Sequence, residues 1–429
     1  MERKMLNGEN LTDRYTGYAI YLPSLQKQYA AYPLRPKTSV RGGDLPAKMR
    51  LRDLDFFDPK SRFWHCKYVL YSAGQFDSSF ISQPDIVSTR DKANTVVIGD
   101  SGGYQVATGK LPATRDWIAD AERPEIIFKR WISQRSIRDN VLRWLDHYSD
   151  FAMTLDMPLF LLKDSSLKSP FSNLSAQQLI DLSVENLRYF ADNRGKATGA
   201  KAKYLNVLQD VGDGTGDAWY DAVKDFDFEG WAFGGGTRNG IDPVLSWMKK
   251  LLDDHKLDKC EWIHILMASP PESAVYYTAI QKALRKATGN ENLQVSFDSS
   301  SPFQMSGIYQ TIAKIPELTA DYKTWRIPAV EYPQNPKFTS DSDIRYLQDI
   351  VSPITRTISI NDFHAKRSGW DVKFFDTFSH QLLTNHNMYV YHRAAVDACD
   401  LVFHPEKRDE ERIPKVVQDN LSKIEQALC

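Results

Sequence analysis

The 429-residue sequence predicts an α/β fold: a closed (β/α)8 barrel of the TIM type with a C-terminal helical extension. Two observations lead to this fold class. Short apolar runs rich in β-branched residues alternate with longer segments of helical period, and a polar residue or a glycine follows most of the runs. Alternating strands and crossover helices are typical of a parallel sheet. The number of runs favours a closed barrel over an open doubly wound sheet.

Seven runs are expected to form the barrel strands. They are 67–74, 95–103, 151–159, 203–211, 230–236, 262–269 and 293–300, and the pattern does not locate the eighth strand. Helices are expected at 125–148, at 175–193 with Ser175 as its N-cap, and at 271–289 with Gly289 as its C-terminal stop.

The alternation stops near residue 315. A loop is expected at 331–343, followed by helices at 343–356, at 377–403 and in the tail at 404–428. The expected organisation is therefore an N-terminal segment packing on the barrel (1–66), the main barrel (67–315), and barrel completion with a C-terminal helical region (316–429).

The composition limits the class of protein. No apolar run is long enough to cross a bilayer, and the N-terminus lacks the apolar core of a signal peptide. The four cysteines are scattered, without metal spacing and too few for a disulfide framework. A soluble, cytoplasmic protein is expected.

The charge is balanced, with 54 basic and 55 acidic residues, so any nucleic-acid surface has to be local. Two segments are candidates. One is 37–52, and the other is the helical segment 129–144, which mixes tryptophans with basic residues: Lys129, Arg130, Arg135 and Arg138. The alternative for the second segment is a solvated charged face beside core tryptophans.

Polar residues and glycines stand where the expected strands stop, which in a barrel is the face that carries active sites. They are Asp100, Ser101, Asp156, Gln209, Gly234, Gly235 and Asp298, and the apolar Met267 stands at an equivalent position. Singly, each is ordinarily a turn former or a helix cap. Two carboxylates at one mouth suit a double displacement at an acetal-type carbon. The glycines allow a flat ligand to approach the backbone, and Tyr104 can stack on it.

The same segments resemble a known family. GDSGGYQV at 99–106 is similar to the Asp-Ser-Gly-Gly-aromatic-Gln motif of the tRNA-guanine transglycosylase superfamily. Six further segments follow in the family's order: TLDMP, YLNVLQ, FGGG, HILMASPPESAVYYTAIQKAL, FDSSSP and LLTNHN. The resemblance covers roughly residues 67–395, and seven motifs in one order make it specific.

The resemblance implies a role for each matching residue. Asp298 would attack the anomeric carbon and form a covalent glycosyl-enzyme, and Asp100 would protonate the departing guanine. Ser101, Asp156, Gln209 and Gly235 would contact the purine edge, Gly234 would belong to the Gly-Gly turn under the base, and Tyr104 and Met267 would sandwich the ring. The target nucleotide would have to flip out of a duplex or lie in a single strand.

Two departures from the tRNA enzymes distinguish the chain. The family's zinc-binding Cys-x-Cys-x-x-Cys stretch corresponds to 355–369, which has no cysteine, so no cofactor is expected. His386 matches the family's histidine ligand, but a packed histidine is the favoured interpretation. A rearranged metal site of His364, His380 and His386 is a minor alternative. Pro302-Phe303-Gln304 replaces the family's Pro-Thr-Arg in the RNA-contacting region.

In these two features the chain resembles the DNA-acting 7-deazaguanine transglycosylases (DpdA type). They imply a pentosyltransferase that replaces guanine in DNA with a 7-deazaguanine such as 7-cyano-7-deazaguanine, in a bacterial or phage-infected cell. A duplex-opening partner is expected, because the chain has no Gly-x-x-x-x-Gly-Lys-Ser/Thr loop. Three alternatives stay open: a divergent tRNA-guanine transglycosylase, a non-catalytic nucleic-acid-binding subunit of that family, and an ordinary barrel glycosidase.

Overall fold

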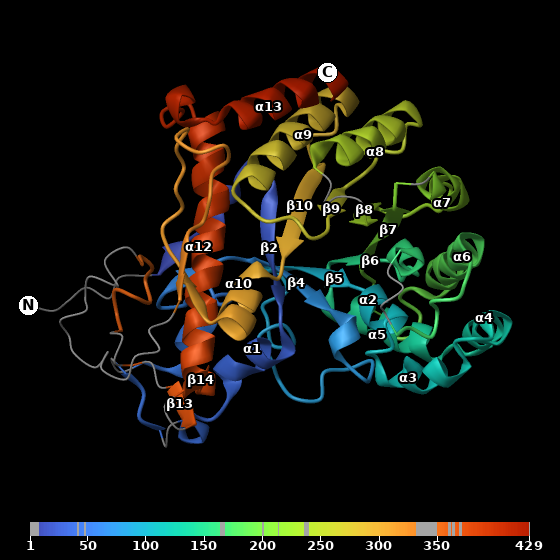
Figure 1. The fold of residues 1–429 in the computed structure, drawn as a ribbon, viewed down its shortest axis with the longest axis horizontal. Helices are drawn as coiled ribbons and strands as arrows, with labels where there is room; N and C mark the ends of the chain where they lie inside the picture. The colour runs from blue at the N-terminus through green and yellow to red at the C-terminus, as the bar shows by residue number, and fades with distance from the viewer. Residues whose placement is uncertain are drawn as a thin grey trace, which may run out of the picture.

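A computed structural model describes residues 8–428, except 41–42, 47–48, 164–167, 200, 213, 236–239, 332–349, 359–361, 363–364 and 369–370. Eight parallel strands close into a barrel in the order β10-β2-β4-β5-β6-β7-β8-β9, with helices around it (Figure 1). The strands are β2 Ile20–Leu25, β4 Tyr68–Ser72, β5 Val96–Asp100, β6 Phe151–Met153, β7 Lys203–Asp210, β8 Gly230–Gly235, β9 Trp262–Ile265 and β10 Gln294–Ser299. The predicted barrel and its seven predicted strands are confirmed.

The strand that the pattern did not locate is β2, within the N-terminal segment. It pairs with β10, where Ile20 is in register with Ser296, and with β4, where Ser24 is in register with Leu70. Pro23 interrupts its apolar run, and proline lowers the strand tendency of a sequence. The N-terminal segment therefore completes the barrel as well as packing on it, and the prediction that residues 316–429 complete the barrel is wrong.

The helices predicted between the barrel strands are found, with one correction. The segment 125–148 forms two helices, α4 Pro124–Ser133 and α5 Ser136–Tyr148, because Gln134 adopts an extended conformation. Helix α6 Ala176–Asn193 begins with a capping box between Ser175 and Gln178. Helix α9 Glu272–Thr288 ends at Gly289, which has a φ of 67°. The other barrel helices are α1 Lys27–Ala31, α2 Gly103–Ala107, α3 Pro112–Arg115, α7 Thr215–Val223, α8 Ile241–Asp253 and α10 Ser301–Gln304.

Two C-terminal helices cover one side of the barrel. Helix α12 Thr377–Phe403 packs on α9 and α10, and α13 Lys415–Leu428 packs on α9 and α8 (Figure 1). Both helices confirm the prediction. Of the segments expected as a loop and a helix at 331–356, residues 332–349 lie outside the described residues; residues 350–356 contain turns and no helix, so the helix predicted at 343–356 is not found in its described part. Three small sheets complete the fold: β1 Glu9–Asn10 with β3 Trp64–His65, β11 Thr311–Ala313 with β12 Ala329–Glu331, and β13 Ala365–Ser368 with β14 Asp371–Phe375.

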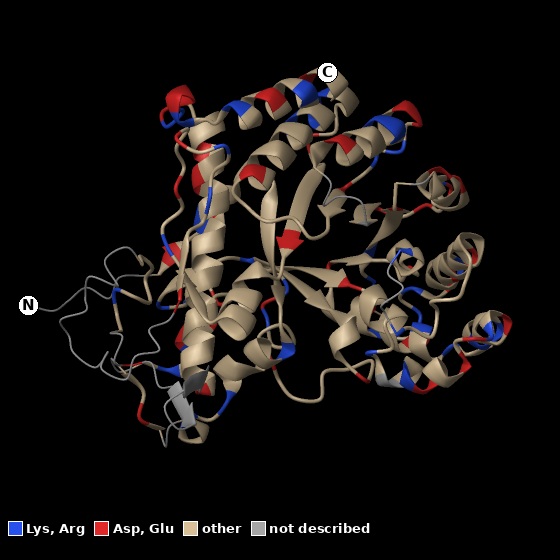
Figure 2. Cartoon of the chain, in the orientation of Figure 1, with Lys and Arg blue, Asp and Glu red and all other residues tan. Residues whose placement is uncertain are grey.

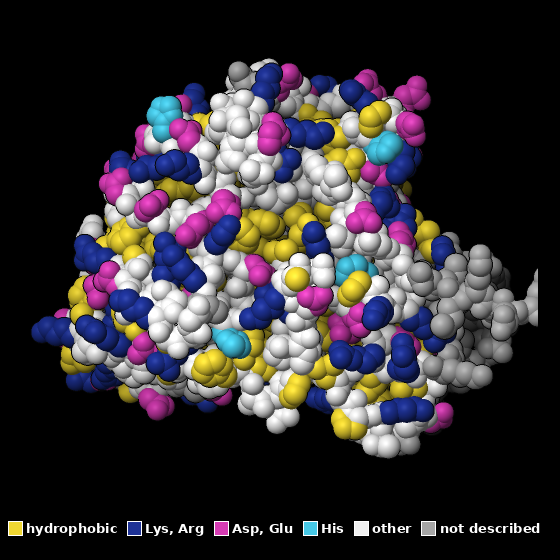
Figure 3. All heavy atoms as spheres, turned by 180° about the vertical axis from the view of Figure 1, so that it is seen from behind, with side chains coloured by type: hydrophobic (Ala, Val, Ile, Leu, Met, Phe, Trp, Pro, Cys, Tyr) yellow, Lys and Arg dark blue, Asp and Glu magenta, His cyan; other side chains and the backbone are white. Residues whose placement is uncertain are grey.

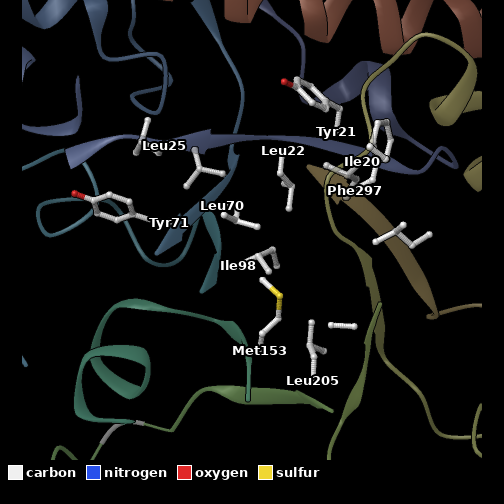
Figure 4. Close-up of a cluster of buried hydrophobic side chains, with 14 of the residues drawn as sticks. Ile20, Tyr21, Leu22, Leu25, Leu70, Tyr71, Ile98, Met153, Leu205 and Phe297 are labelled. Atoms are coloured by element: carbon white, nitrogen blue, oxygen red, sulfur yellow. The ribbon is translucent and has the colours of Figure 1, made fainter. Parts of the chain in front are cut away.

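The barrel interior is packed with apolar side chains. Leu22, Leu70, Ile98, Met153 and Leu205 come from five neighbouring strands, lie close together in Figure 4 and are almost fully buried. Because these side chains fill the lumen, a ligand site has to be built at the carboxyl ends of the strands. In the described part of the chain, no helix has the length and apolar character needed to span a membrane.

Candidate functional site

The polar residues predicted from the sequence lie at one end of the barrel. Asp100, Gln209 and Gly235 are at or next to the carboxyl ends of β5, β7 and β8, and Asp298 is the penultimate residue of β10. Ser101, Asp156 and Met267 follow β5, β6 and β9 within three residues. Parallel strands bring these residues to one rim, as predicted.

Asp298 is held by three groups from two neighbouring strands and their ends, β9 and β2. Its carboxylate is 5% exposed. Its Oδ1 accepts a hydrogen bond from the backbone N–H of Met267 at 3.1 Å and lies 3.3 Å from Nε2 of His264. Its Oδ2 accepts a hydrogen bond from the hydroxyl of Ser24. The backbone at Met267 adopts a φ of 62°, unusual for a residue other than glycine.

Asp100 is a carboxylate in a different environment. Burial raises its pKa, and the negative charge of Asp298 raises it further, while hydrogen bonds from Ser72 and from the backbone N–H of Gly102 (3.1 Å) oppose that rise. Gly102 has a φ of 81°, and a Cβ atom there would lie 2.4 Å from Cα of Gly74. The turn that positions Asp100 therefore requires glycine.

Asp156 and Gln209 form a buried pair. The Gln209 Nε2 donates to Oδ2 of Asp156 at 2.7 Å, while the Gln209 Oε1 is buried without a hydrogen-bond partner. Burial raises the pKa of Asp156 to about 7, against the hydrogen bond from Gln209, and the charge of Asp100 contributes to the rise. Cβ atoms at Gly103 and Gly234 would lie 2.8 and 2.5 Å from the two polar side chains. These glycines therefore make room for the pair, a role that the sequence did not indicate.

Two large side chains are exposed at this end of the barrel. Tyr104 is 46% exposed and Met267 is 45% exposed, whereas Ser101 is buried. The ring of Tyr104 contacts Phe160, with 5.6 Å between centroids, and lies under Nζ of Lys110 at 4.6 Å. Tyr104 is therefore held in place while remaining available to stack on a planar ligand.

Sequence reasoning missed Ser24, Ser72 and His264, which contact the two candidate catalytic carboxylates. A signal for His264 was present. It interrupts the apolar run of β9, and Trp262 shares its strand face by the two-residue period, while Ser296 lies opposite it on β10.

The basic helical segment is only partly available for nucleic acid. Lys129 and Arg135 are exposed, and Arg130 pairs with Asp120 at 2.5 Å. Arg138 is 1% exposed and donates to the carbonyls of Trp131 and Ile132 and to Glu185, at 3.1, 2.9 and 3.3 Å. The interpretation of Arg138 as a nucleic-acid contact is therefore wrong, because its donors fix α4 to α5 and α6.

Arg138→Ala is expected to lower the free energy of unfolding by about 2–4 kcal/mol, because two carbonyls and a carboxylate lose their donor. Arg135→Ala, an exposed change on the same helix, is the matched control and should change it by less than about 0.5 kcal/mol. Urea unfolding measures both. Equal stability of the two variants, with weaker DNA binding only in Arg138→Ala, would restore the nucleic-acid role.

Charges of both signs are interspersed over the outer helices (Figure 2), and the face opposite to Figure 1 also mixes them around apolar areas (Figure 3). Among the described residues, basic side chains do not cover most of any face seen in these views. Of the other basic segment, 37–52, residues 41–42 and 47–48 are outside the described residues. In the described part of the chain seen in these views, the cations available to a polyanion are therefore small groups.

His386 is a packed histidine, as the sequence favoured. Its Nδ1 lies 2.8 Å from Oγ of Ser352 and its Nε2 lies 2.8 Å from the carbonyl of Ala313. Burial lowers its pKa to about 4. Burial also lowers the pKa of His380, and His364 lies outside the described residues. Within the ranges described, no cluster of histidine, cysteine, aspartate or glutamate is arranged to hold a metal ion.

A scan against protein-family models and a search of curated proteins returned no match to this chain. What the site does is therefore inferred from its geometry and from the motifs in the sequence.

Proposed function

We propose that this protein is a pentosyltransferase that replaces guanine in DNA with a 7-deazaguanine, such as 7-cyano-7-deazaguanine. The observation that carries the proposal is a pair of electrostatically coupled carboxylates at one barrel mouth, in two different environments. Asp298 accepts donors on both oxygens, whereas burial and the charge of Asp298 raise the pKa of Asp100. Such a pair suits one nucleophile and one proton carrier.

In the first half-reaction, Asp298 attacks C1′ of the target deoxyribose. A bond forms between its carboxylate oxygen and C1′, the C1′–N9 bond breaks, and the electron pair leaves with the purine. Asp100 donates a proton to the departing base. Its raised pKa keeps the carboxyl group protonated to a higher pH than an ordinary aspartate, which supports this role.

In the second half-reaction, the incoming base enters the same pocket. Its N9–H proton passes to the Asp100 carboxylate, N9 bonds to C1′, and the C1′–oxygen bond to Asp298 breaks. Both carboxyl groups then return to their starting forms. The exchange therefore needs no external acid, base or cofactor.

Recognition of guanine is assigned to the buried pair. An ionised Asp156 can accept from N1–H and from the 2-amino group, and the unpartnered Oε1 of Gln209 offers a further acceptor. Tyr104 and Met267, both exposed, would cover the two faces of the ring. A buried acceptor oxygen without a hydrogen-bond donor favours a ligand whose N–H groups can donate to it.

Guanine binding is expected to depend on pH through Asp156. Only the ionised carboxylate accepts two N–H groups, and its pKa is about 7. The KM for free guanine should therefore rise roughly tenfold per unit as the pH falls below 7, and level off above it. Initial rates of guanine incorporation between pH 5.5 and 8.5 measure this. Asp156→Asn should bind weakly and without this dependence; a flat KM in the wild type would contradict the assignment.

DNA is preferred over tRNA as the polymer for two reasons. The zinc-binding cysteines of the tRNA enzymes are absent from the sequence, and Phe303, in the segment that replaces Pro-Thr-Arg, is buried against Tyr29 with 5.8 Å between ring centroids. Lys129, Arg130 and Arg135 remain the proposed phosphate contacts. We also propose a cytoplasmic location and a duplex-opening partner.

The experiment that tests the proposal is incorporation of radiolabelled guanine into matched single-stranded DNA, duplex DNA and tRNA by the purified protein. Label in single-stranded DNA supports the proposal, and label in duplex DNA as well would remove the need for an opening partner. Label in tRNA alone would make it a divergent tRNA enzyme. Label in none of them, with tight DNA binding, would favour the non-catalytic subunit.

A further inference from the structure

We infer that His264 is a positioning residue for Asp298, set by a directed chain of hydrogen bonds from Trp262 through Ser296, and that Oδ2 of Asp298 is the attacking atom. The catalytic consequence rests on the proposed function. The chain itself is a property of the fold and can be measured without activity.

The four side chains form one continuous buried line. Nε1 of Trp262 donates to Oγ of Ser296 at 2.7 Å. The same Oγ lies 2.9 Å from Nδ1 of His264, whose Nε2 lies 3.3 Å from Oδ1 of Asp298. His264 is 0% exposed, so no solvent competes for either ring nitrogen.

The strands place these groups together by register. In the pairing of β9 with β10, Trp262 is opposite Gln294 and His264 is opposite Ser296. Asp298 follows Ser296 by two residues, and His264 follows Trp262 by two, so each pair lies on one face of its strand. The chain therefore runs along the strands toward the mouth.

The two ends set the direction of the chain. An indole N–H can only donate, so Ser296 accepts from Trp262. An ionised carboxylate can only accept, so Nε2 of His264 donates to Asp298. In a neutral histidine Nδ1 is then left to accept the hydroxyl proton of Ser296. Each group thus has a defined donor or acceptor role.

The donors leave one oxygen of Asp298 more open than the other. Oδ1 receives Met267 N–H and His264 Nε2–H, while Oδ2 receives, from the described residues, only the hydroxyl of Ser24. A carboxylate has about four lone-pair positions. The remaining position is on Oδ2, which identifies it as the oxygen that bonds to C1′. When the ester forms, Oδ1 becomes its carbonyl oxygen and keeps both hydrogen-bond donors.

Another charged side chain, that of Asp100 on β5, interacts electrostatically with Asp298 at the end of this line of hydrogen bonds. In addition to burial, the negative charge of Asp298 raises the pKa of Asp100. A change at His264 is therefore expected to move the pH dependence of exchange as well as its rate. A residue that only fills space would not do this.

A matched pair of variants separates the two contacts of His264. In His264→Gln the amide nitrogen can take the place of Nε2 and donate to Asp298. In His264→Asn the shorter side chain can keep the contact to Ser296, but it cannot reach Asp298. We expect kcat for exchange to fall about 100-fold in His264→Asn and less than tenfold in His264→Gln, with KM for guanine changed less than about threefold in both.

The pH profile provides the readout that a structural role would not move. The acid limb of the rate profile should shift upward by about one unit in His264→Asn, because the carboxylate loses a donor, and remain in place in His264→Gln. Equal rates and unchanged pH profiles in the two variants would overturn the inference.

The protonation of His264 is measured independently in ¹⁵N-histidine-labelled protein, with His264→Gln used to assign the resonance. We expect the neutral form protonated at Nε2. The Nδ1–H form or the imidazolium would overturn the directed chain, whatever the activity. Absence of base exchange in wild-type protein that shows the Nε2–H form would instead overturn the proposed function and leave the chain standing.

Discussion

Asp298→Ala is expected to abolish base exchange, lowering kcat by about 10⁴-fold or more, because it removes the carboxylate that is proposed to form the ester with C1′. Asp298→Asn should be equally inactive, since a carboxamide of the same shape is not a nucleophile. Guanine incorporation into single-stranded DNA under saturating conditions measures the loss.

The matched control for Asp298 is Asp210, the last residue of β7, whose carboxylate accepts from the backbone N–H of Gly212 at 2.8 Å. Asp210→Asn changes an acid at the end of another barrel strand and should retain exchange within about threefold. Retained exchange in Asp298→Asn, or equal losses in the two variants, would remove Asp298 from the reaction.

Asp100→Asn is expected to lower exchange of guanine by about 10²–10⁴-fold, because the departing purine loses its proton donor. The covalent step should recover when the leaving base needs no proton. An oligonucleotide with N7-methylguanine at the target position supplies such a base, since the methylated ring already carries a positive charge.

Release of the methylated base separates an acid from a structural role. Asp100→Asn should release N7-methylguanine within about tenfold of the wild-type rate while exchanging guanine slowly. Equal losses with both bases would show that Asp100 maintains the shape of the mouth, where its carboxylate accepts from Gly102 at 3.1 Å, and donates no proton.

The barrel strands were predictable where a strand is a clean apolar run. Seven of them carry their signal in β-branched and aromatic residues, but β2 contains Pro23, and nothing local shows that it closes the sheet. The break between α4 and α5 was missed because Gln134 and Arg135 fit a helical period. Tertiary packing decides such positions.

The rim of the site was predictable because parallel strands of a barrel end on one face. Asp100, Asp156 and Asp298 could be placed together on this basis. The buried role of Arg138 could not, because its partners are two backbone carbonyls at the end of α4, and sequence patterns do not encode them. The role of Gly234 depends in the same way on Gln209, a neighbour on the adjacent strand.

The most direct test of the central claim is the mass of the protein after reaction with a target single-stranded oligonucleotide in the absence of free base, followed by proteolysis and peptide mapping. We predict one covalent sugar adduct, located on Asp298, which disappears when guanine is added and does not form in Asp298→Asn. An adduct on another residue, or base exchange without any adduct, would contradict the mechanism.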